Sequence, residues 1–248
     1  MLPATGRPQI FLQACLNGGR QKAEHPGVPV TPAELARDAR TVRAAGAVAL
    51  HLHPRDRHGR ESLHRDDVAS ALAAVRAAVP GMPVGIGTGA WISPGGRLRH
   101  EFMRDWNILP DYASVNLGEE DAPKVMGLLQ EKGIGIEAGL LCLADAERFL
   151  EFDIAHSVLR ILVEMPMNDG EEAIKTCRDI LAMLADAGIS RPVLVHGEGG
   201  SVWPMMHFAA TRGLAARAGF EDSLWLADGR LARDNAQIIE AACRILSS

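Results

Sequence analysis

The stretch Thr31–Asp56 reads TPAELARDARTVRAAGAVALHLHPRD and contains the signals of one helix followed by one strand. Its first four residues, Thr-Pro-Ala-Glu, are typical of a helix start, with a threonine cap, proline in the first turn and glutamate at the third helical position. We predict a helix over Pro32–Ala45 and a strand over the apolar run Val48–His53. A helix that leads directly into a buried strand is the repeating unit of an α/β fold.

The same alternation continues along the chain. Eight short apolar runs are predicted as strands: Gln9–Leu16, Val48–His53, Met82–Thr88, Tyr112–Leu117, Gly133–Leu140, Val158–Glu164, Pro192–His196 and Leu214–Gly219. Longer stretches of helical period lie between them: Pro32–Ala45, Arg65–Val79, Ala122–Lys132, Asp145–Phe152, Glu171–Ala187 and Asn235–Leu246. Strands that alternate with helices predict a parallel sheet, which is either closed into a barrel or open and doubly wound.

The number of repeats favours the closed form. An open dinucleotide-binding sheet should carry G-x-G-x-x-G after its first strand, whereas this chain has Leu-Asn-Gly-Gly-Arg over residues 16–20. Eight repeats in 248 residues match one (β/α)8 barrel of about 250 residues. We therefore predict a TIM barrel that occupies residues 1–248 as a single domain.

Composition excludes several classes of protein. The net charge of −5 does not favour nucleic acid or an anionic membrane as a partner. The four cysteines form no C-x-x-C pair, which argues against a disulfide framework or a thiolate zinc site. No stretch reaches the roughly 20 apolar residues of a membrane helix, and Met1–Pro8 lacks the features of a signal peptide. We expect a cytoplasmic protein.

The sharpest chemical feature is the pair His51 and His53 at the end of the second predicted strand. Alternate residues of a strand share one face, so the two imidazoles point the same way. Barrel enzymes place their active sites at the carboxyl ends of the strands. The pair therefore predicts a metal site, although two hydrogen-bonded histidines without a metal, or one ligand and one bystander, have the same spacing.

Such a metal needs a third protein ligand, and two glutamates compete for the position. Glu198 follows the seventh predicted strand, and Glu221 follows the eighth. In a closed barrel one strand separates the eighth from the second, while two strands separate the seventh from it. Glu221 therefore has the shorter reach. Arg217, Gly219 and Glu221 are alternate residues, so the side chains of Arg217 and Glu221 lie on the same side of the chain. An ordinary surface ion pair can have the same spacing.

Two glycine-rich loops are candidate binding segments. Gly197, Gly199 and Gly200 follow the seventh strand, where barrels frequently bind phosphate through backbone N–H groups. This loop could serve a phosphate-bearing cofactor such as coenzyme A, or it could be a flexible turn. The segment Gly85–Gly89 after the third strand offers backbone amides and the hydroxyl of Thr88 to a carboxylate.

Taken together, these segments resemble the β-keto acid cleavage enzymes, whose best-known member is the 3-keto-5-aminohexanoate cleavage enzyme. The resemblance extends over nearly the whole chain, and its most specific blocks are the first and the last. The blocks are Pro29–Glu34, Ala45–Ala47, His51–Asp56, Gly87–Gly89, Ala113–Gly118, Arg217–Leu224 and Ala227–Gly229.

The resemblance implies a (β/α)8 barrel and assigns roles to several residues. It implies one Zn²⁺ held by His51, His53 and Glu221, with Asp222 as the catalytic base and Arg217 as the group that orients this base. It also implies contacts between the protein and the substrate: an acidic contact from Glu137 on the fifth strand, and a carboxylate site near Thr88 and Asn116.

The implied reaction joins a β-keto acid to acetyl-CoA and splits the product by a retro-Claisen step into a new acyl-CoA and acetoacetate. One departure concerns the loop after the first strand. The aminohexanoate-cleaving member carries a glutamate there for the substrate's ammonium group, whereas this chain has Arg20 nearby. We therefore expect a β-keto acid with a neutral or anionic side chain.

Two alternatives remain at this point: another metal-dependent barrel lyase or hydrolase, and a metal- or ligand-binding barrel without activity. Hydrolases of that kind usually carry H-x-H on the first strand and further histidines later, unlike this chain. The intact Arg217, Glu221 and Asp222 argue against an inactive barrel. The resemblance further implies a homotetramer.

Overall fold

The computed structural model describes residues 10–248 and confirms the predicted barrel. Eight parallel strands pair in chain order, and the last strand pairs with the first, so the sheet is closed. The strands are β1 (Leu12–Cys15), β2 (Ala49–Leu52), β3 (Val84–Gly87), β4 (Tyr112–Asn116), β5 (Gly135–Leu140), β6 (Arg160–Met165), β7 (Val193–Gly197) and β8 (Ala215–Ala218).

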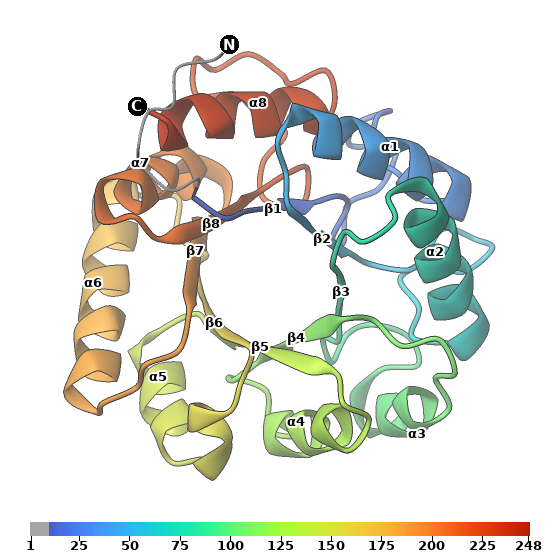
Figure 1. Cartoon of the computed structure of the whole chain (residues 1–248), viewed down its shortest axis with the longest axis horizontal. Helices are drawn as coiled ribbons and strands as arrows, with labels where there is room; N and C mark the ends of the chain where they lie inside the picture. Colours follow the sequence, from blue (N-terminus) through green and yellow to red (C-terminus); the bar gives the residue numbers. More distant parts are fainter. Residues whose placement is uncertain (1–9) are drawn as a thin grey trace.

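The helices form a ring outside the strands (Figure 1). They are α1 (Pro32–Ala45), α2 (Arg65–Ala78), α3 (Arg99–Arg104), α4 (Ala122–Glu131), α5 (Leu143–Leu150), α6 (Gly170–Asp186), α7 (Val202–Arg212) and α8 (Asn235–Leu246). Three short 3-10 helices are η1 (Gly96–Leu98), η2 (Asp153–His156) and η3 (Gly199–Ser201). Apolar side chains of strands and helices meet between the two layers and form the core.

The predicted boundaries agree closely where the local signals are strong. Thr31 caps α1 through a complete capping box with Glu34, which explains why this helix begins at Pro32. The helix α3 has only six residues and was not predicted, because so short a segment shows no helical period. Gln9, where the first strand was predicted to begin, lies outside the described residues.

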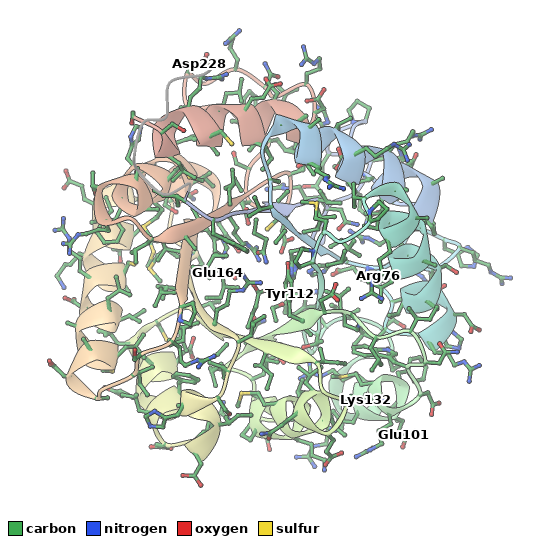
Figure 2. The ribbon with its side chains drawn as sticks, viewed as in Figure 1. Arg76, Glu101, Tyr112, Lys132, Glu164 and Asp228 are labelled. Carbon is green, nitrogen blue, oxygen red and sulfur yellow. The ribbon has the colours of Figure 1, made fainter. Side chains whose placement is uncertain are left out.

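Polar side chains fill the inside of the barrel beneath its carboxyl rim. The Gln13 amide donates to the Tyr112 hydroxyl and to Glu137 Oε1, both at 2.9 Å, and Arg160 Nε lies 2.7 Å from the same Glu137 oxygen. Figure 2 shows Tyr112 and Glu164 inside the ring of strands, while Glu101 and Asp228 lie outside. This buried layer fills the inside of the barrel below the carboxyl rim.

Within residues 10–248, no helix combines the length and the apolar composition that crossing a membrane requires.

Candidate metal centre

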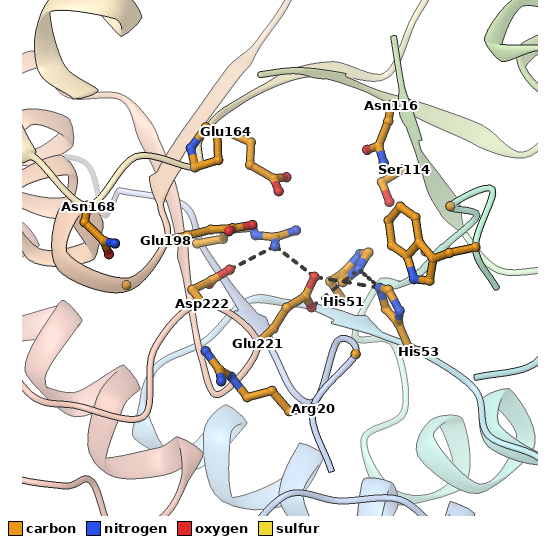
Figure 3. A pocket seen from close by; sticks show the side chains of 17 residues that line it. Arg20, His51, His53, Ser114, Asn116, Glu164, Asn168, Glu198, Glu221 and Asp222 are labelled. Atoms are coloured by element: carbon orange, nitrogen blue, oxygen red, sulfur yellow. Dashed lines mark hydrogen bonds and ion pairs between the residues drawn. The ribbon is translucent and has the colours of Figure 1, made fainter. Parts of the chain in front are cut away.

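His51, His53 and Glu221 meet at the rim above β2 and β8 (Figure 3). The Nε2 atoms of the two histidines are 3.1 Å apart. Glu221 Oε2 lies 3.6 Å from His51 Nε2, and Glu221 Oε1 lies 3.7 Å from His53 Nε2. Only β1 separates β8 from β2 in the barrel, so the structure brings Glu221 to the histidine pair, as predicted from the shorter reach.

The three side chains fit a divalent metal. Two ligands that share one tetrahedral ion at about 2 Å are separated by about 3.3 Å, close to the three distances observed here. His51 Nδ1 and Glu221 Oε2 have no hydrogen-bond partner among the described residues, although both atoms are buried. Burial lowers the pKa of His51 to about 3, so its imidazole is neutral and able to coordinate. A shared cation would satisfy these buried groups.

Glu61 holds the second histidine in the orientation that coordination requires. Its Oε1 atom lies 2.5 Å from His53 Nδ1, on the side of the ring opposite Nε2. A carboxylate at Nδ1 fixes the proton there and leaves the Nε2 lone pair free for a metal. Glu61 reaches this position because the chain turns back after β2 and pairs Arg55 with Glu61 in an isolated bridge.

Two glycines lie so close to the candidate metal ligands that a larger residue would collide with them. A Cβ atom on Gly87, at the end of β3, would lie 2.3 Å from His53 Nε2. One on Gly18, whose φ is +50°, would lie 2.3 Å from the Glu221 Cγ atom. The ligand side chains therefore occupy the space that larger residues at these two positions would need.

Arg217 lies between two carboxylates. Its Nη2 atom donates to Glu221 Oε1 at 3.0 Å and to Asp222 Oδ1 at 2.9 Å. Burial raises the pKa of Glu221, but Arg217 and the two histidines outweigh it and lower this pKa to about 2. Glu221 is therefore ionised at neutral pH. Asp222 is 1% exposed, and its Oδ2 atom has no partner among the described residues.

Glu164 at the end of β6 and Glu198 after β7 line the opposite wall of the cavity (Figure 3), and the buried His196 of β7 contacts Glu164. His196 Nε2 lies 3.1 Å from Glu164 Oε2, and its Nδ1 lies 3.4 Å from Asp222 Oδ1. Burial and Arg217 lower the pKa of His196, but Glu164 and Asp222 outweigh them and raise it to about 9. This imidazole is therefore a cation between two carboxylates.

The cavity between these walls has a volume of about 550 Å³ and includes some of the other predicted residues. Arg20 lies at its edge, where Nε donates to the Phe220 carbonyl oxygen and Nη1 pairs with Glu24. Asn116 lines the β4 side, and its amide nitrogen is 3.4 Å from Glu119 Oε1.

Thr88 and Glu137 are near the cavity but do not line it. The Thr88 hydroxyl donates to the Ser114 carbonyl oxygen at 2.7 Å. Glu137 is fully buried in the polar layer and paired with Arg160, and burial raises its pKa. The structure therefore brings Asp222 and Arg217 together with His51, His53 and Glu221, which we call the metal group. It places Glu137 below these residues.

The predicted phosphate loop uses much of its own hydrogen-bonding capacity internally. The Gly199 N–H donates to the Asp222 carbonyl oxygen at 2.9 Å, and the Gly200 N–H donates to Asn168 Oδ1 at 3.0 Å. A Cβ on Gly197 would lie 2.3 Å from Ser201 Oγ, so this glycine permits close packing of the loop. Of the three glycines, Gly199 lines the cavity.

Sequence reasoning missed Glu61, Glu164 and His196. The last two had a usable signal, because each is a titratable residue that follows an apolar run near the carboxyl end of its strand. Glu61 had no such signal, since a loop of several residues separates it from the histidine that it contacts.

The chain is similar to several known proteins. The family model for the beta-keto acid cleavage enzyme matches residues 9–131 and 160–248. A 3-keto-5-aminohexanoate cleavage enzyme from Fusobacterium nucleatum is 24% identical and aligns with 96% of this chain and 91% of its own length. The 3-oxoadipate:acetyl-CoA acetyltransferase of Cupriavidus necator is 30% identical over 117 residues, which are 47% of this chain and 40% of that protein.

Solved structures show the same fold. The apo structure of ObcA superposes with a TM-score of 0.70 at 16% identity, over 87% of this chain and 61% of that chain. This chain thus spans less than two thirds of the length of ObcA. A type I 3-dehydroquinate dehydratase from Clostridium difficile gives a TM-score of 0.62 at 9% identity, over 98% of this chain and 93% of that chain. The family match over most of the sequence, on a closed barrel with this rim, shows that the chain belongs to the beta-keto acid cleavage enzyme family.

Proposed function

We propose that this protein is a zinc-dependent enzyme that converts a β-keto acid and acetyl-CoA into a new acyl-CoA and acetoacetate. The family supports cleavage of a β-keto acid, and the acetyltransferase relative supports acetyl-CoA as the second substrate. Two imidazoles and one carboxylate form a ligand set that suits zinc better than magnesium, which prefers oxygen ligands. When bound, the metal supplies Lewis acidity that draws electron density from the substrate's ketone oxygen.

Asp222 is the proposed base. It takes a proton from the carbon between ketone and carboxylate, and the resulting carbanion attacks the acetyl carbonyl carbon of acetyl-CoA and expels the CoA thiolate. The thiolate then attacks the original ketone carbon, the bond between that carbon and the former methylene breaks, and the released carbanion regains the proton from Asp222. All atoms of the β-keto acid and acetyl-CoA are thereby distributed between the new acyl-CoA and acetoacetate.

The neighbours of Asp222 suit this role. Arg217 holds Asp222 Oδ1, so the unpartnered Oδ2 is the oxygen available to a substrate proton. Arg217 Nη2 and His196 Nδ1 both lie near Asp222 Oδ1, at 2.9 and 3.4 Å. Asp222 therefore has one oxygen held by Arg217 and one oxygen that faces no partner among the described residues, next to the candidate ligand Glu221.

We place the substrate carboxylate on the β3–β4 side of the cavity, near Asn116 and the Thr88 segment. Arg20 at the opposite edge disfavours a cationic side chain, so a neutral or anionic one is proposed.

We propose that CoA crosses the rim at Gly199. The N–H groups of Gly199 and Gly200 already donate hydrogen bonds within the protein, so they do not form a ready phosphate-binding site. A direct substrate contact from Glu137 would use its Oε2 atom, because Arg160 and Gln13 both contact Oε1. The homotetramer and the cytoplasmic location stay predictions.

The observation that carries the proposal is the placement of an unpartnered, buried Asp222 oxygen beside a three-ligand metal group. The test is incubation of the zinc-loaded protein with 3-oxohexanoate or 3-oxoadipate and acetyl-CoA, followed by mass spectrometry of acyl-CoA and acetoacetate. Asp222→Asn should reduce turnover by about 10⁴-fold or more and leave bound zinc unchanged. Asp105→Asn, at an exposed aspartate of the α3 C-terminus, is the matched control. Wild-type turnover in Asp222→Asn would disprove the base assignment.

A further inference from the structure

The wall of β6 and β7 carries two acids that the proposed chemistry does not use. Glu164 and Glu198 both line the cavity, across from the metal group (Figure 3). If the ketone lies at the metal and the carboxylate lies toward Asn116 on β4, the rest of the β-keto acid extends toward this wall. The two glutamates are therefore placed to contact the substrate's side chain.

The charge of Glu164 is already balanced. His196 lies 3.1 Å from Glu164 Oε2, and this interaction outweighs the effect of burial and lowers the pKa of Glu164. Glu164 is thus a carboxylate, held by His196 on one side and by a side-chain hydrogen bond with Glu198. An incoming ammonium group is not needed to neutralise it.

Glu198 differs from the other cavity acids because no Lys, Arg or His nitrogen within residues 10–248 lies within 4.0 Å of its carboxyl group. Burial and the hydrogen-bonded carboxylate of Glu164 raise the pKa of Glu198 to about 7. At neutral pH the two acids therefore share a proton in a large fraction of molecules. Such a pair offers an O–H donor and a carboxylate acceptor side by side.

A further buried group points to a ligand in the same space. Asp222 Oδ2 has no hydrogen-bond partner among the described residues, although it lies in a residue that is 1% exposed and lines the cavity. Buried polar atoms are nearly always satisfied in the working state of a protein. The cavity is therefore built to hold a polar molecule that extends from the metal group to the far wall.

We propose that Glu164 and Glu198 form a subsite for a hydroxyl group on the side chain of the β-keto acid. A hydroxyl donates one hydrogen bond and accepts others, so it can donate to Glu164 and accept from Glu198. This inference rests on the proposed function, and it narrows the neutral or anionic side chain expected from Arg20 to a neutral, hydroxyl-bearing one.

Other side chains fit this wall less well. A second carboxylate would approach the negative charge of Glu164 and has no cation on β6 or β7 that is free of a carboxylate partner. An ammonium group would find the carboxylates of Glu164 and Asp222 already paired with His196 and Arg217. The cation Arg20 at the cavity edge would also repel it. An alkyl group would leave both glutamates without a ligand partner in a partly dehydrated site.

The test compares matched ligands of one chain length. Dissociation constants are measured by calorimetry on the zinc-loaded protein, without acetyl-CoA, for 3-oxohexanoate and its 5-hydroxy, 6-hydroxy and 5-amino derivatives, and for 3-oxoadipate. One hydroxyl derivative should bind about 10- to 100-fold more tightly than 3-oxohexanoate, the range for a hydrogen bond to a charged group. Equal affinity for the hydroxylated and unsubstituted acids, or tightest binding of the amino or dicarboxylic acid, overturns the inference.

Variants of Glu198 separate recognition from folding. The Glu198 backbone makes its own hydrogen bonds with Met165 and Ser201, so a side-chain replacement leaves them in place. Glu198→Leu should reduce the hydroxyl preference to less than about threefold, since leucine can neither donate nor accept. Glu198→Gln should retain most of it, because an amide does both. Glu131→Gln, at an exposed residue of α4, is the control and should match the wild type.

The same ligands distinguish this inference from the proposed function. A protein that turns over the β-keto acids with acetyl-CoA but shows no hydroxyl preference refutes the subsite alone. A protein that prefers the hydroxylated acid in binding yet produces no acyl-CoA refutes the proposed function alone. A hydroxyl preference that survives unchanged in Glu198→Leu refutes the assignment to this glutamate.

Discussion

Replacement of Gly87 by alanine tests how tightly the histidine pair is confined. The new Cβ would lie 2.3 Å from His53 Nε2 and 2.6 Å from His53 Cε1, whereas ordinary contacts begin at 3.4 Å. The imidazole must therefore move by about 1.1 Å, the difference between 3.4 and 2.3 Å. Metal–ligand distances tolerate changes of about 0.2 Å, so a shift of this size removes His53 from the ion.

The expected consequence is a large loss of metal affinity with a modest loss of stability. Removing the hydrogen-bonding partner of a ligand weakens metal binding by about 10- to 100-fold, and displacement of the ligand itself should exceed that range. Zinc affinity is measured by competition with a chromophoric chelator, and folding is followed by circular dichroism. We expect Gly87→Ala to fold as a barrel and to bind zinc at least about 100-fold more weakly than the wild type.

Gly127→Ala provides the matched control. Gly127 lies inside α4, and a Cβ there meets nothing within 4 Å. Alanine at such a helical position stabilises a protein by about 0.5–1 kcal/mol and should leave zinc affinity unchanged. Wild-type zinc affinity in Gly87→Ala would refute the reasoning, because it would mean that His53 does not bind the ion from the position described here.

Two further predictions concern groups outside the metal's direct ligands. Glu61→Gln should weaken zinc binding by about 10- to 100-fold, because the carboxylate at His53 Nδ1 is lost; the same chelator competition measures it, and unchanged affinity would contradict the role assigned to Glu61. Burial raises the pKa of Asp38 to about 7, so the folded state binds a proton that the unfolded state releases near pH 4. The stabilisation that Asp38 contributes should therefore decrease as the pH rises from about 4 to 7. Urea titrations measure it as the difference in the free energy of unfolding between the wild type and Asp38→Asn; a difference that stays constant over this pH range would contradict the prediction.

The fold was predictable because its signals are local and repeated. The capping box of Thr31 and Glu34 and the apolar run of β2 each specify one unit, and eight such units in one domain leave few arrangements other than a closed barrel. The helix α3 was missed because it has no such local signal. Its six residues are ordered by Arg99, which is buried against Glu119 and Asp121 after β4, and this contact has no local signature.

The metal group was predictable from spacing, while the far wall was not. His51 lies on β2 and His53 directly follows this strand, and the closed barrel itself brings Glu221 within reach. The pairing of Glu164 with His196 instead depends on the register of β6 against β7, which places these two residues opposite one another. The contact between Glu61 and His53 depends on the path of a loop. Neither a register nor a loop path can be obtained from hydrophobic periodicity alone.

The metal content of the purified protein, measured together with its activity during chelation, decides whether the reaction depends on a bound metal ion. We expect one zinc ion per chain, loss of turnover of β-keto acid and acetyl-CoA as this ion is removed, and recovery after one equivalent of Zn²⁺ is returned. His51→Ala should not recover in this way. Full activity in protein from which all metal has been removed would show that the reaction does not depend on the ion.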